Sequence, residues 1–116
     1  REQMRLRWRA YFEDYDLLLC PTAASAAFIH DHLGERPDRT ININGQQELV
    51  VDQLFWGGLS GVVYLPSTVA PAGLTRAGLP CGLQLIAPYL EDNTAIHFAQ
   101  LMKDVVGGFQ SPPGYE

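Results

Sequence analysis

The side chains that could carry acid–base or nucleophilic chemistry are few in this chain of 116 residues. Histidine occurs only at positions 30, 32 and 97, lysine only at 103, and cysteine only at 20 and 81. A serine or cysteine hydrolase needs a nucleophile and a base within hydrogen-bond reach, and donors that stabilise the oxyanion. The sequence therefore offers little material for such a centre.

A Gly-rich stretch around Ser60 superficially resembles the nucleophile elbow of serine hydrolases. The Gly-x-Ser-x-Gly motif of that elbow would place glycine two residues after Ser60, where the sequence has Val62. We therefore interpret the stretch 57–61 as a helix end, where small residues allow close packing.

Two other groups of side chains are candidates for reactive centres. Cys20 with His30 could form a thiolate pair, because an imidazolium lowers a thiol pKa, but Cys20 ends an apolar run typical of an inert core position. His30, Asp31 and His32 form a candidate metal cluster, because alternate residues of an extended segment point the same way. No third ligand is evident, so the favoured interpretation is a solvated loop without a metal.

Composition and charge narrow the class of protein further. Hydrophobic residues make up 47% of the chain, which favours a packed core in one domain, or part of one. The formal net charge is −5, although Arg1, Arg5, Arg7 and Arg9 crowd the first ten residues. These arginines indicate the solvated side of a helix, so we expect no nucleic-acid partner. No apolar stretch approaches the ~20 residues of a membrane span, and we expect a cytoplasmic chain.

The first half of the chain predicts a helix, a strand, a long loop and a hairpin. Apolar residues spaced by three and four predict an amphipathic helix over 2–14. The apolar run 16–20, closed by Pro21, predicts a strand buried on both faces, as in a parallel or mixed sheet. Residues 21–38 are expected to be a surface loop. Asn44-Gly45 predicts a tight turn between strands 40–43 and 46–50.

The second half predicts two helices and a strand pair. A helix is expected from Val51 to about Leu59 or Gly61. Strands are predicted over 62–65 and 81–87, and we expect them to pair. Acidic and capping residues at 91–94 predict the start of a final helix that ends at Gly107-Gly108. Residues 110–116 are expected to be a tail of the single segment 1–116.

Five pieces of the chain, in one order, resemble the amidase signature family. Tyr15–Thr22 resembles its D-x-L-L-x-P-T strand, and Arg39–Gly45 its hairpin. Leu65–Gly73 and Gly78–Pro88 are similar to its block P-x-G followed by G-L-P-x-G-x-Q-x-I-x-P. Glu91-Asp92 and the helix beyond resemble its acidic cap and last helix. One departure is that the pattern N-x-x-G-x-P, matched at Leu59–Val63, has Val63 in place of proline.

The resemblance implies the C-terminal part of an amidase with an α/β fold, its layers arranged α/β/α around a mixed sheet with a hairpin and flanking helices. In that family catalysis uses a lysine and two serines of a Gly-Ser-rich motif upstream, and no such motif occurs in this chain. We therefore predict no catalytic residue, no metal and no cofactor here, and no amidase activity for the chain alone. The parent would hydrolyse a carboxamide through an acyl-enzyme. Because the sequence begins with Arg1 rather than Met, an excised segment is expected.

The resemblance also implies that loops after the strand ends line the pocket of the parent enzyme. The residues we predict to bind its small amide substrate are Pro21, Thr22, Ala23, Trp56, Ser67 and Thr68. For each of them a purely structural role, in a turn, a helix or a strand end, is the competing interpretation.

Three alternatives remain open at this point. The chain could be a self-contained binding or assembly module without catalytic descent, or a metal enzyme centred on His30–His32. It could also be part of a tRNA-dependent amidotransferase rather than of a free amidase. In either amidase interpretation we expect bare apolar surface that promotes self-association.

Overall fold

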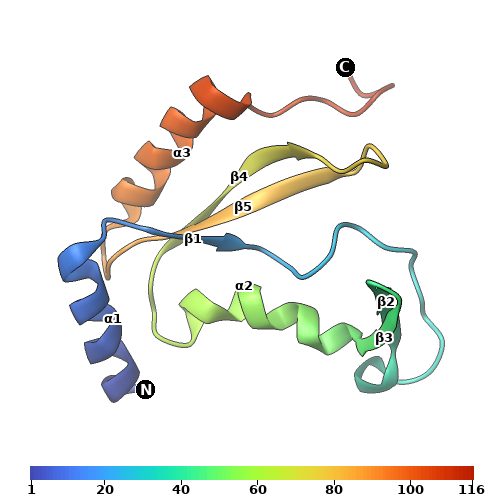
Figure 1. The fold of residues 1–116 in the computed structure, drawn as a ribbon, viewed down its shortest axis with the longest axis horizontal. Coiled ribbons are helices and arrows are strands. Elements are labelled where there is room, and N and C mark those ends of the chain that lie inside the picture. Colours follow the sequence, from blue (N-terminus) through green and yellow to red (C-terminus); the bar gives the residue numbers. More distant parts are fainter.

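A three-stranded antiparallel sheet in the order β1-β5-β4 lies between two helices. The computed structural model describes all residues from 1 to 116. Its elements in chain order are α1 (Glu2–Asp14), β1 (Leu18–Pro21), a 3-10 turn (Arg36–Asp38), β2 (Thr40–Ile43), β3 (Gln46–Leu49), a 3-10 turn (Val50–Gln53), α2 (Leu54–Gly61), β4 (Ser67–Leu74), β5 (Pro80–Ile86) and α3 (Asp92–Val106). In Figure 1, α3 lies above the sheet and α2 below it. None of the helices combines the length and the apolarity that a membrane span requires.

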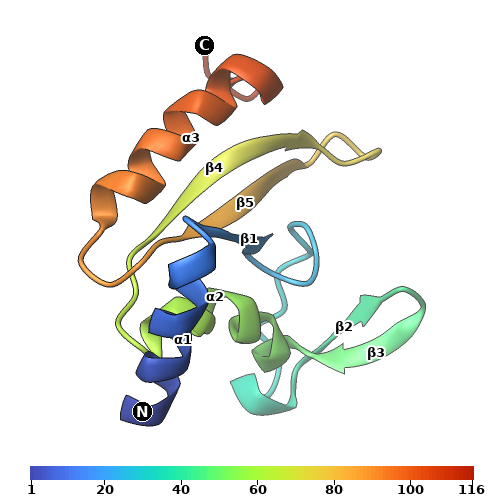
Figure 2. The same cartoon turned by 60° about the vertical axis from the view of Figure 1, so that its left-hand side comes forward.

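The hairpin β2–β3 forms as its turn residues predict. Asn44 and Gly45 both adopt positive φ, 53° and 86°, which is the geometry of the tight turn favoured by Asn-Gly. The Asn42 side-chain oxygen accepts a hydrogen bond of 2.9 Å from the Gly45 amide. Figure 2 shows that the hairpin projects away from the central sheet, to which it adds no strand.

The predicted strand over 62–65 is wrong, and the strand that pairs with β5 starts at Ser67. Residues 62–65 instead lead out of α2 through a turn in which Tyr64 has a φ of +61°. Pro66 has no amide hydrogen to give to a ladder. Glycine adopts positive φ most easily, and Tyr64 has the positive φ two residues before Pro66. The Gly-x-Pro part of the pattern N-x-x-G-x-P therefore fits Tyr64–Pro66 better than the expected Leu59–Val63, with tyrosine in place of the glycine.

The α/β class, the hairpin and the flanking helices are confirmed, but the expected mixed sheet is not observed. Both neighbours of β5 run antiparallel to it. Strand β1 is also not buried on both faces, because Cys20 is buried while Leu19 is 44% exposed. Within this chain β1 is an edge strand, and nothing covers the Leu19 side fully.

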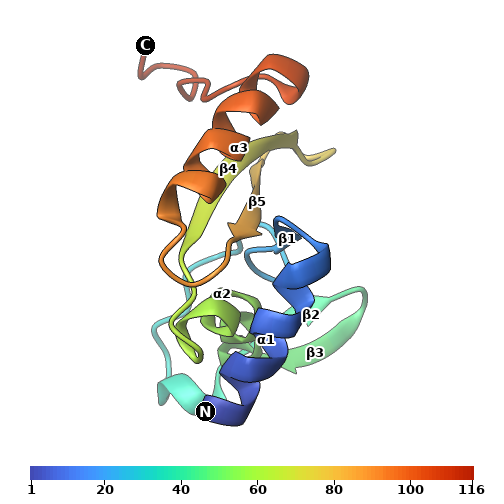
Figure 3. The ribbon, with the colours of Figure 1, turned by 90° about the vertical axis from the view of Figure 1, so that its left-hand side faces the viewer.

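The main apolar cluster lies on the side of the sheet that faces α3, and the buried Val63 and Ile86 lie outside it. Leu85 and Ala87, from β5 and the residue after it, pack there with Ala70 and with Ala95 of α3. Figure 3 shows α3 running along β4 and β5. Only nine of the 116 residues are buried, and the radius of gyration is 16.4 Å, whereas a compact chain of this length has about 13 Å. The chain therefore leaves much apolar surface open.

Candidate functional site

The opposite side of the sheet, which faces α2, combines several polar groups with the fully buried side chain of Ile86. Cross-strand partners in an antiparallel pair share a face. Cys20 pairs with Gln84, and Ser67 pairs with Ile86, the β5 residue two positions further along. Because residues two apart in a strand point the same way, all three polar side chains lie on one face. We call this surface the α2 face.

Gln84 is the centre of the α2 face. Its side chain is buried, with 2% of its surface exposed. The amide nitrogen donates a hydrogen bond of 3.1 Å to the backbone carbonyl of Trp56 in α2 and lies 3.6 Å from Cys20 Sγ in β1. One side chain therefore links β5 to both α2 and β1, and it fixes the position of the helix turn that carries the Trp56 ring.

Thr22 lies just beyond β1, where the chain passes close to α2. Its hydroxyl oxygen Oγ1 is buried and has no hydrogen-bond partner. Gly57 and Gly82 lie beside Thr22, since a Cβ on Gly57 would be in ordinary contact with the Thr22 carbonyl, at 3.7 Å, and one on Gly82 with Thr22 Oγ1, at 3.8 Å. Ser25 then anchors the following loop through its amide and hydroxyl, which both donate to the Gln53 side-chain oxygen. The unpartnered hydroxyl is thus held in a defined place.

Two serines meet at the end of the α2 face nearest the start of β4. The hydroxyl of Ser60, which is buried in α2, lies 3.1 Å from that of Ser67. Neither hydroxyl has a hydrogen bond to an imidazole, an amine or a carboxylate. Activation of a serine requires such a base, so the pair links α2 to β4 without forming a nucleophile.

Cys20 is equally unsuited to nucleophilic chemistry. Burial raises the pKa of its thiol, and the hydrogen bond from Gln84 only partly opposes that effect. The thiol therefore stays protonated near neutral pH, whereas the nucleophile in cysteine chemistry is the thiolate. Its polar partner is Gln84, and the hypothetical pairing with His30 does not form.

The six residues predicted to bind substrate are divided between the two sides of the sheet. Thr22 and Ser67 lie on the α2 side, where the backbone carbonyl of Trp56 bonds to Gln84, and Ala23, which follows Thr22, is half-buried. Pro21 and Thr68 are paired with Leu83 and Leu85, which contact α3, so their side chains lie on the other face. None of the six lines either of the two largest cavities.

Sequence reasoning missed Gln84, although a signal was present. A glutamine inside the otherwise apolar run 83–87 is an expensive residue to bury unless it is hydrogen-bonded. That cost alone indicates a buried polar contact at this position.

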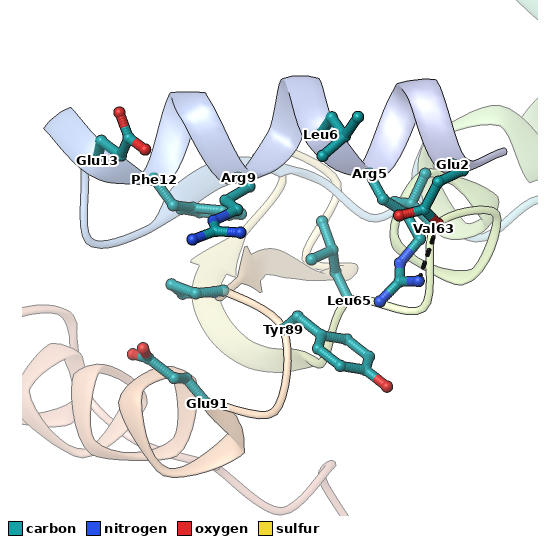
Figure 4. A pocket seen from close by; sticks show the side chains of 11 residues that line it. Glu2, Arg5, Leu6, Arg9, Phe12, Glu13, Val63, Leu65, Tyr89 and Glu91 are labelled. Atoms are coloured by element: carbon teal, nitrogen blue, oxygen red, sulfur yellow. Dashed lines mark hydrogen bonds and ion pairs between the residues drawn. The ribbon is translucent and has the colours of Figure 1, made fainter.

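One of the two largest cavities, about 550 Å³, lies between α1 and the turn before α3. Figure 4 shows Arg5 and Arg9 reaching toward it from α1, with Tyr89 and Glu91 on the other side. Arg5 pairs with Glu2 at 3.1 Å, and its guanidinium stacks 4.6 Å from the centre of the Tyr89 ring. This cavity is far richer in charge than the α2 face, and it contains no residue that we predicted to bind substrate.

The candidate metal cluster does not assemble. His30 and His32 lie edge to face, with ring centres 5.9 Å apart. The Asp31 carboxylate accepts a hydrogen bond from the Leu33 amide. No group of three or more His, Cys, Asp or Glu side chains converges in the chain, so the arrangement gives no support to a metal enzyme.

Known proteins similar to this chain are amidases and their relatives. It is 31% identical over 97% of its length to a Glutamyl-tRNA(Gln) amidotransferase protein of Exiguobacterium sp., of which it covers 21%. Indoleacetamide hydrolase of Bradyrhizobium diazoefficiens is 33% identical over 86% of the chain, which covers 18% of that protein. The chain thus spans about a fifth of the length of these relatives.

A solved structure and a family model complete the comparison. The solved structure, reported as a vestigial protein complex that reveals the evolutionary origins of an s-triazine catabolic enzyme, shares the fold over 95% of this chain with a TM-score of 0.69 and 23% identity. The chain covers 24% of that protein. The model of the Amidase family matches residues 1–96. The chain, with its antiparallel sheet and polar α2 face, therefore belongs to the amidase family.

Proposed function

We propose that this chain is the C-terminal part of an amidase that hydrolyses a carboxamide C–N bond, and that its α2 face forms one wall of the substrate pocket. The observation that carries the proposal is the buried hydroxyl of Thr22, which has no hydrogen-bond partner and lies on the side of the sheet where Gln84 binds the α2 backbone at Trp56. A buried polar group without a partner is costly, and a ligand or another chain segment that bonds to it removes that cost.

The chemistry of the α2 face suits a small amide. A hydroxyl can both donate and accept a hydrogen bond, so Thr22 can donate to the carbonyl oxygen of a carboxamide or accept from its N–H group. Trp56 supplies a large apolar surface for the rest of the molecule. These features match binding sites in which a few polar groups orient a ligand among apolar walls.

The bond-breaking groups lie outside this chain in our proposal. Ser60 and Ser67 have no base, and the thiol of Cys20 stays protonated. We expect the isolated chain to release no ammonia from simple amides. Hydrolysis of a simple amide by the pure 116-residue chain, if it is lost in the Ser60→Ala or Cys20→Ala variant, would contradict this part of the proposal.

A second candidate is part of a tRNA-dependent amidotransferase. It is favoured by the relatives from Exiguobacterium sp. and Maricaulis maris, which are named as Glutamyl-tRNA(Gln) amidotransferase proteins and are 31% and 34% identical to this chain. The two candidates share the α2 face and differ in the protein that the chain completes. Chimeras built on one relative of each kind distinguish them.

The decisive experiment places residues 1–116 in the Bradyrhizobium indoleacetamide hydrolase, in exchange for the matching fifth of that enzyme. A parallel chimera uses the Exiguobacterium amidotransferase protein. We expect the first chimera to hydrolyse indoleacetamide, and the Thr22→Val substitution in it to raise KM more than it lowers kcat. Thr68→Val is the matched control, because it makes the same chemical change on the α3 side of the sheet.

Two outcomes would contradict the proposal. The first is a folded chimera without activity in either background. The second is an equal effect of Thr22→Val and Thr68→Val on KM.

A further inference from the structure

Helix α1 carries a line of aromatic side chains, none of which is fully buried by the rest of the chain. Met4, Trp8 and Tyr11 follow one another at spacings of four and three, so they lie in one line along the helix, and the ring of Tyr15, the residue just after the helix, continues that line by stacking on Tyr11. The rings contact one another within that line, with Trp8 and Tyr11 centred 5.6 Å apart and Tyr11 and Tyr15 centred 4.8 Å apart. We call this line the aromatic stripe.

The aromatic stripe lies on a different side of α1 from the residues that line the cavity beside the helix. The α1 residues that line the cavity beside the helix, and that Figure 4 shows facing it, are Glu2, Arg5, Leu6, Arg9, Phe12 and Glu13. At about 100° per residue, the centre of that set lies roughly 120° or more around the helix from the stripe. No residue of α1 is buried. Met4 and Tyr15, at the two ends of the stripe, are 44% and 57% exposed, and Trp8 and Tyr11, at its middle, are half-buried.

Charge is distributed unevenly along α1. The first nine residues of the chain include Arg1, Arg5, Arg7 and Arg9, whereas Glu13, Asp14 and Asp16 follow toward the end of the helix. Arg7 and Asp14 are seven residues apart and therefore lie on the same flank of the stripe, two helical turns from each other. The structure contains one ion pair, Arg5 with Glu2, so both Arg7 and Asp14 lack an ionic partner.

We propose that the aromatic stripe binds the same stripe of a second copy of this chain, with the two helices antiparallel. This arrangement rests on charge complementarity, since it sets the basic half of each helix beside the acidic half of the other. When the midpoints of the two stripes coincide, Trp8 lies opposite the partner's Tyr11. Arg7 then lies within about 3 Å, along the axis, of the level of the partner's Asp14, and twofold symmetry repeats the pair.

A parallel arrangement is disfavoured by the same charges. It would place the four arginines of one copy beside the four of the other, and the acidic ends likewise. Like charges at close range reduce association and oppose the wrong pairing. The pattern of charge therefore selects one orientation as well as one partner, and it does so independently of the function proposed above.

The test uses two charge-reversal variants of the 116-residue chain, Arg7→Glu and Asp14→Arg. Each variant alone turns both expected ion pairs into repulsions, so we expect it to self-associate about tenfold more weakly than the unchanged chain. A mixture of equal amounts of the two variants restores both pairs in a mixed dimer, and we expect it to associate as strongly as the unchanged chain. Sedimentation velocity over a range of concentrations measures all four samples, and far-ultraviolet circular dichroism checks that each stays folded.

Arg76→Glu is the matched control, because it makes the same change of charge at the exposed tip between β4 and β5. It should not reverse the effect of Asp14→Arg in a mixture. The proposal is overturned if the unchanged chain stays monomeric, if the single variants associate as it does, or if their mixture does not recover. Association that ignores both variants would place the contact elsewhere, such as the free edge of β1.

Discussion

The two faces of the central sheet differ in what holds them to their helices. On the α3 side, Leu85 and Ala87 pack with Ala95 and Ala70 in an apolar cluster. On the α2 side, hydrogen bonds from Gln84 and between Ser60 and Ser67 make the connections. Apolar burial stabilises in proportion to area and without direction, whereas buried polar groups fix geometry and are costly when incomplete. The α3 side is therefore held mainly by apolar burial, whereas the α2 side adds directional polar contacts to the buried Ile86.

The largest expected effect comes from the α3 side. Leu85→Ala removes a fully buried side chain from the apolar cluster, and we expect the free energy of unfolding to fall by about 2–5 kcal/mol. Urea denaturation followed by circular dichroism measures the loss. Leu101→Ala, on the half-exposed side of α3, should cost less than ~1 kcal/mol. Equal losses for the two variants would mean that the cluster is not the main core.

Breaking the α2 side should cost less and change more of the local geometry. Gln84→Leu removes the donor to the Trp56 carbonyl and leaves that acceptor without its partner. We expect a loss of about 1–3 kcal/mol, together with a changed fluorescence of Trp56 in a Trp8→Phe background.

Gln46→Leu is the control for this change, because Gln46 is exposed in β3 and the substitution should leave stability within ~0.5 kcal/mol. If Gln84→Leu proves neutral and Trp56 fluorescence is unchanged, Gln84 does not position α2.

Close packing on the α2 face predicts a third effect, at Gly82. A Cβ at this position would lie 2.9 Å from Val69 Cγ1, which a stiff β-branched side chain cannot easily avoid. We expect Gly82→Ala to lower the free energy of unfolding by about 1–2 kcal/mol. Combining it with Val69→Ala should recover part of the loss, because the clash is with Val69 alone among side-chain carbons. A double variant in which the two losses simply add would show that the clash is relieved in another way.

What the sequence predicts well is set locally, and what it misses depends on distant partners. The Asn44-Gly45 turn and the amphipathic patterns of α1 and α3 need only nearest neighbours, and each forms as expected. The predicted strand over 62–65 has a suitable apolar run, but Pro66 and the positive φ of Tyr64 move the strand start to Ser67. An apolar run reports hydrophobicity and not pairing.

The candidate site shows the same division. Thr22 and Trp56 can be selected from the resemblance, but the hydrogen bond that holds the Trp56 backbone to the sheet comes from Gln84, 28 residues beyond Trp56 in sequence. Thr68 is predicted together with Ser67 because the two are adjacent, yet neighbours in a strand point to opposite faces. Which of the two belongs to the α2 face requires the register of β4 against β5.

The smallest effect expected on the α2 face is a dependence of stability on alkaline pH. Burial raises the pKa of the Cys20 thiol above its value in the unfolded chain, which is about 8.5. Below that value the thiol is protonated in both states and contributes no pH dependence. Above it the unfolded chain loses the proton first, so the free energy of unfolding falls as pH rises toward the raised pKa of the folded thiol.

Cys20→Ala should make this fall shallower in urea titrations between about pH 8 and 10, whereas Cys81→Ala, which keeps Cys20, should preserve it. If the free energy of unfolding falls equally steeply with pH in the Cys20→Ala variant and in the unchanged chain, the α2 face admits enough water to solvate the thiolate. The two sides of the sheet would then differ in their access to water as well as in their contacts.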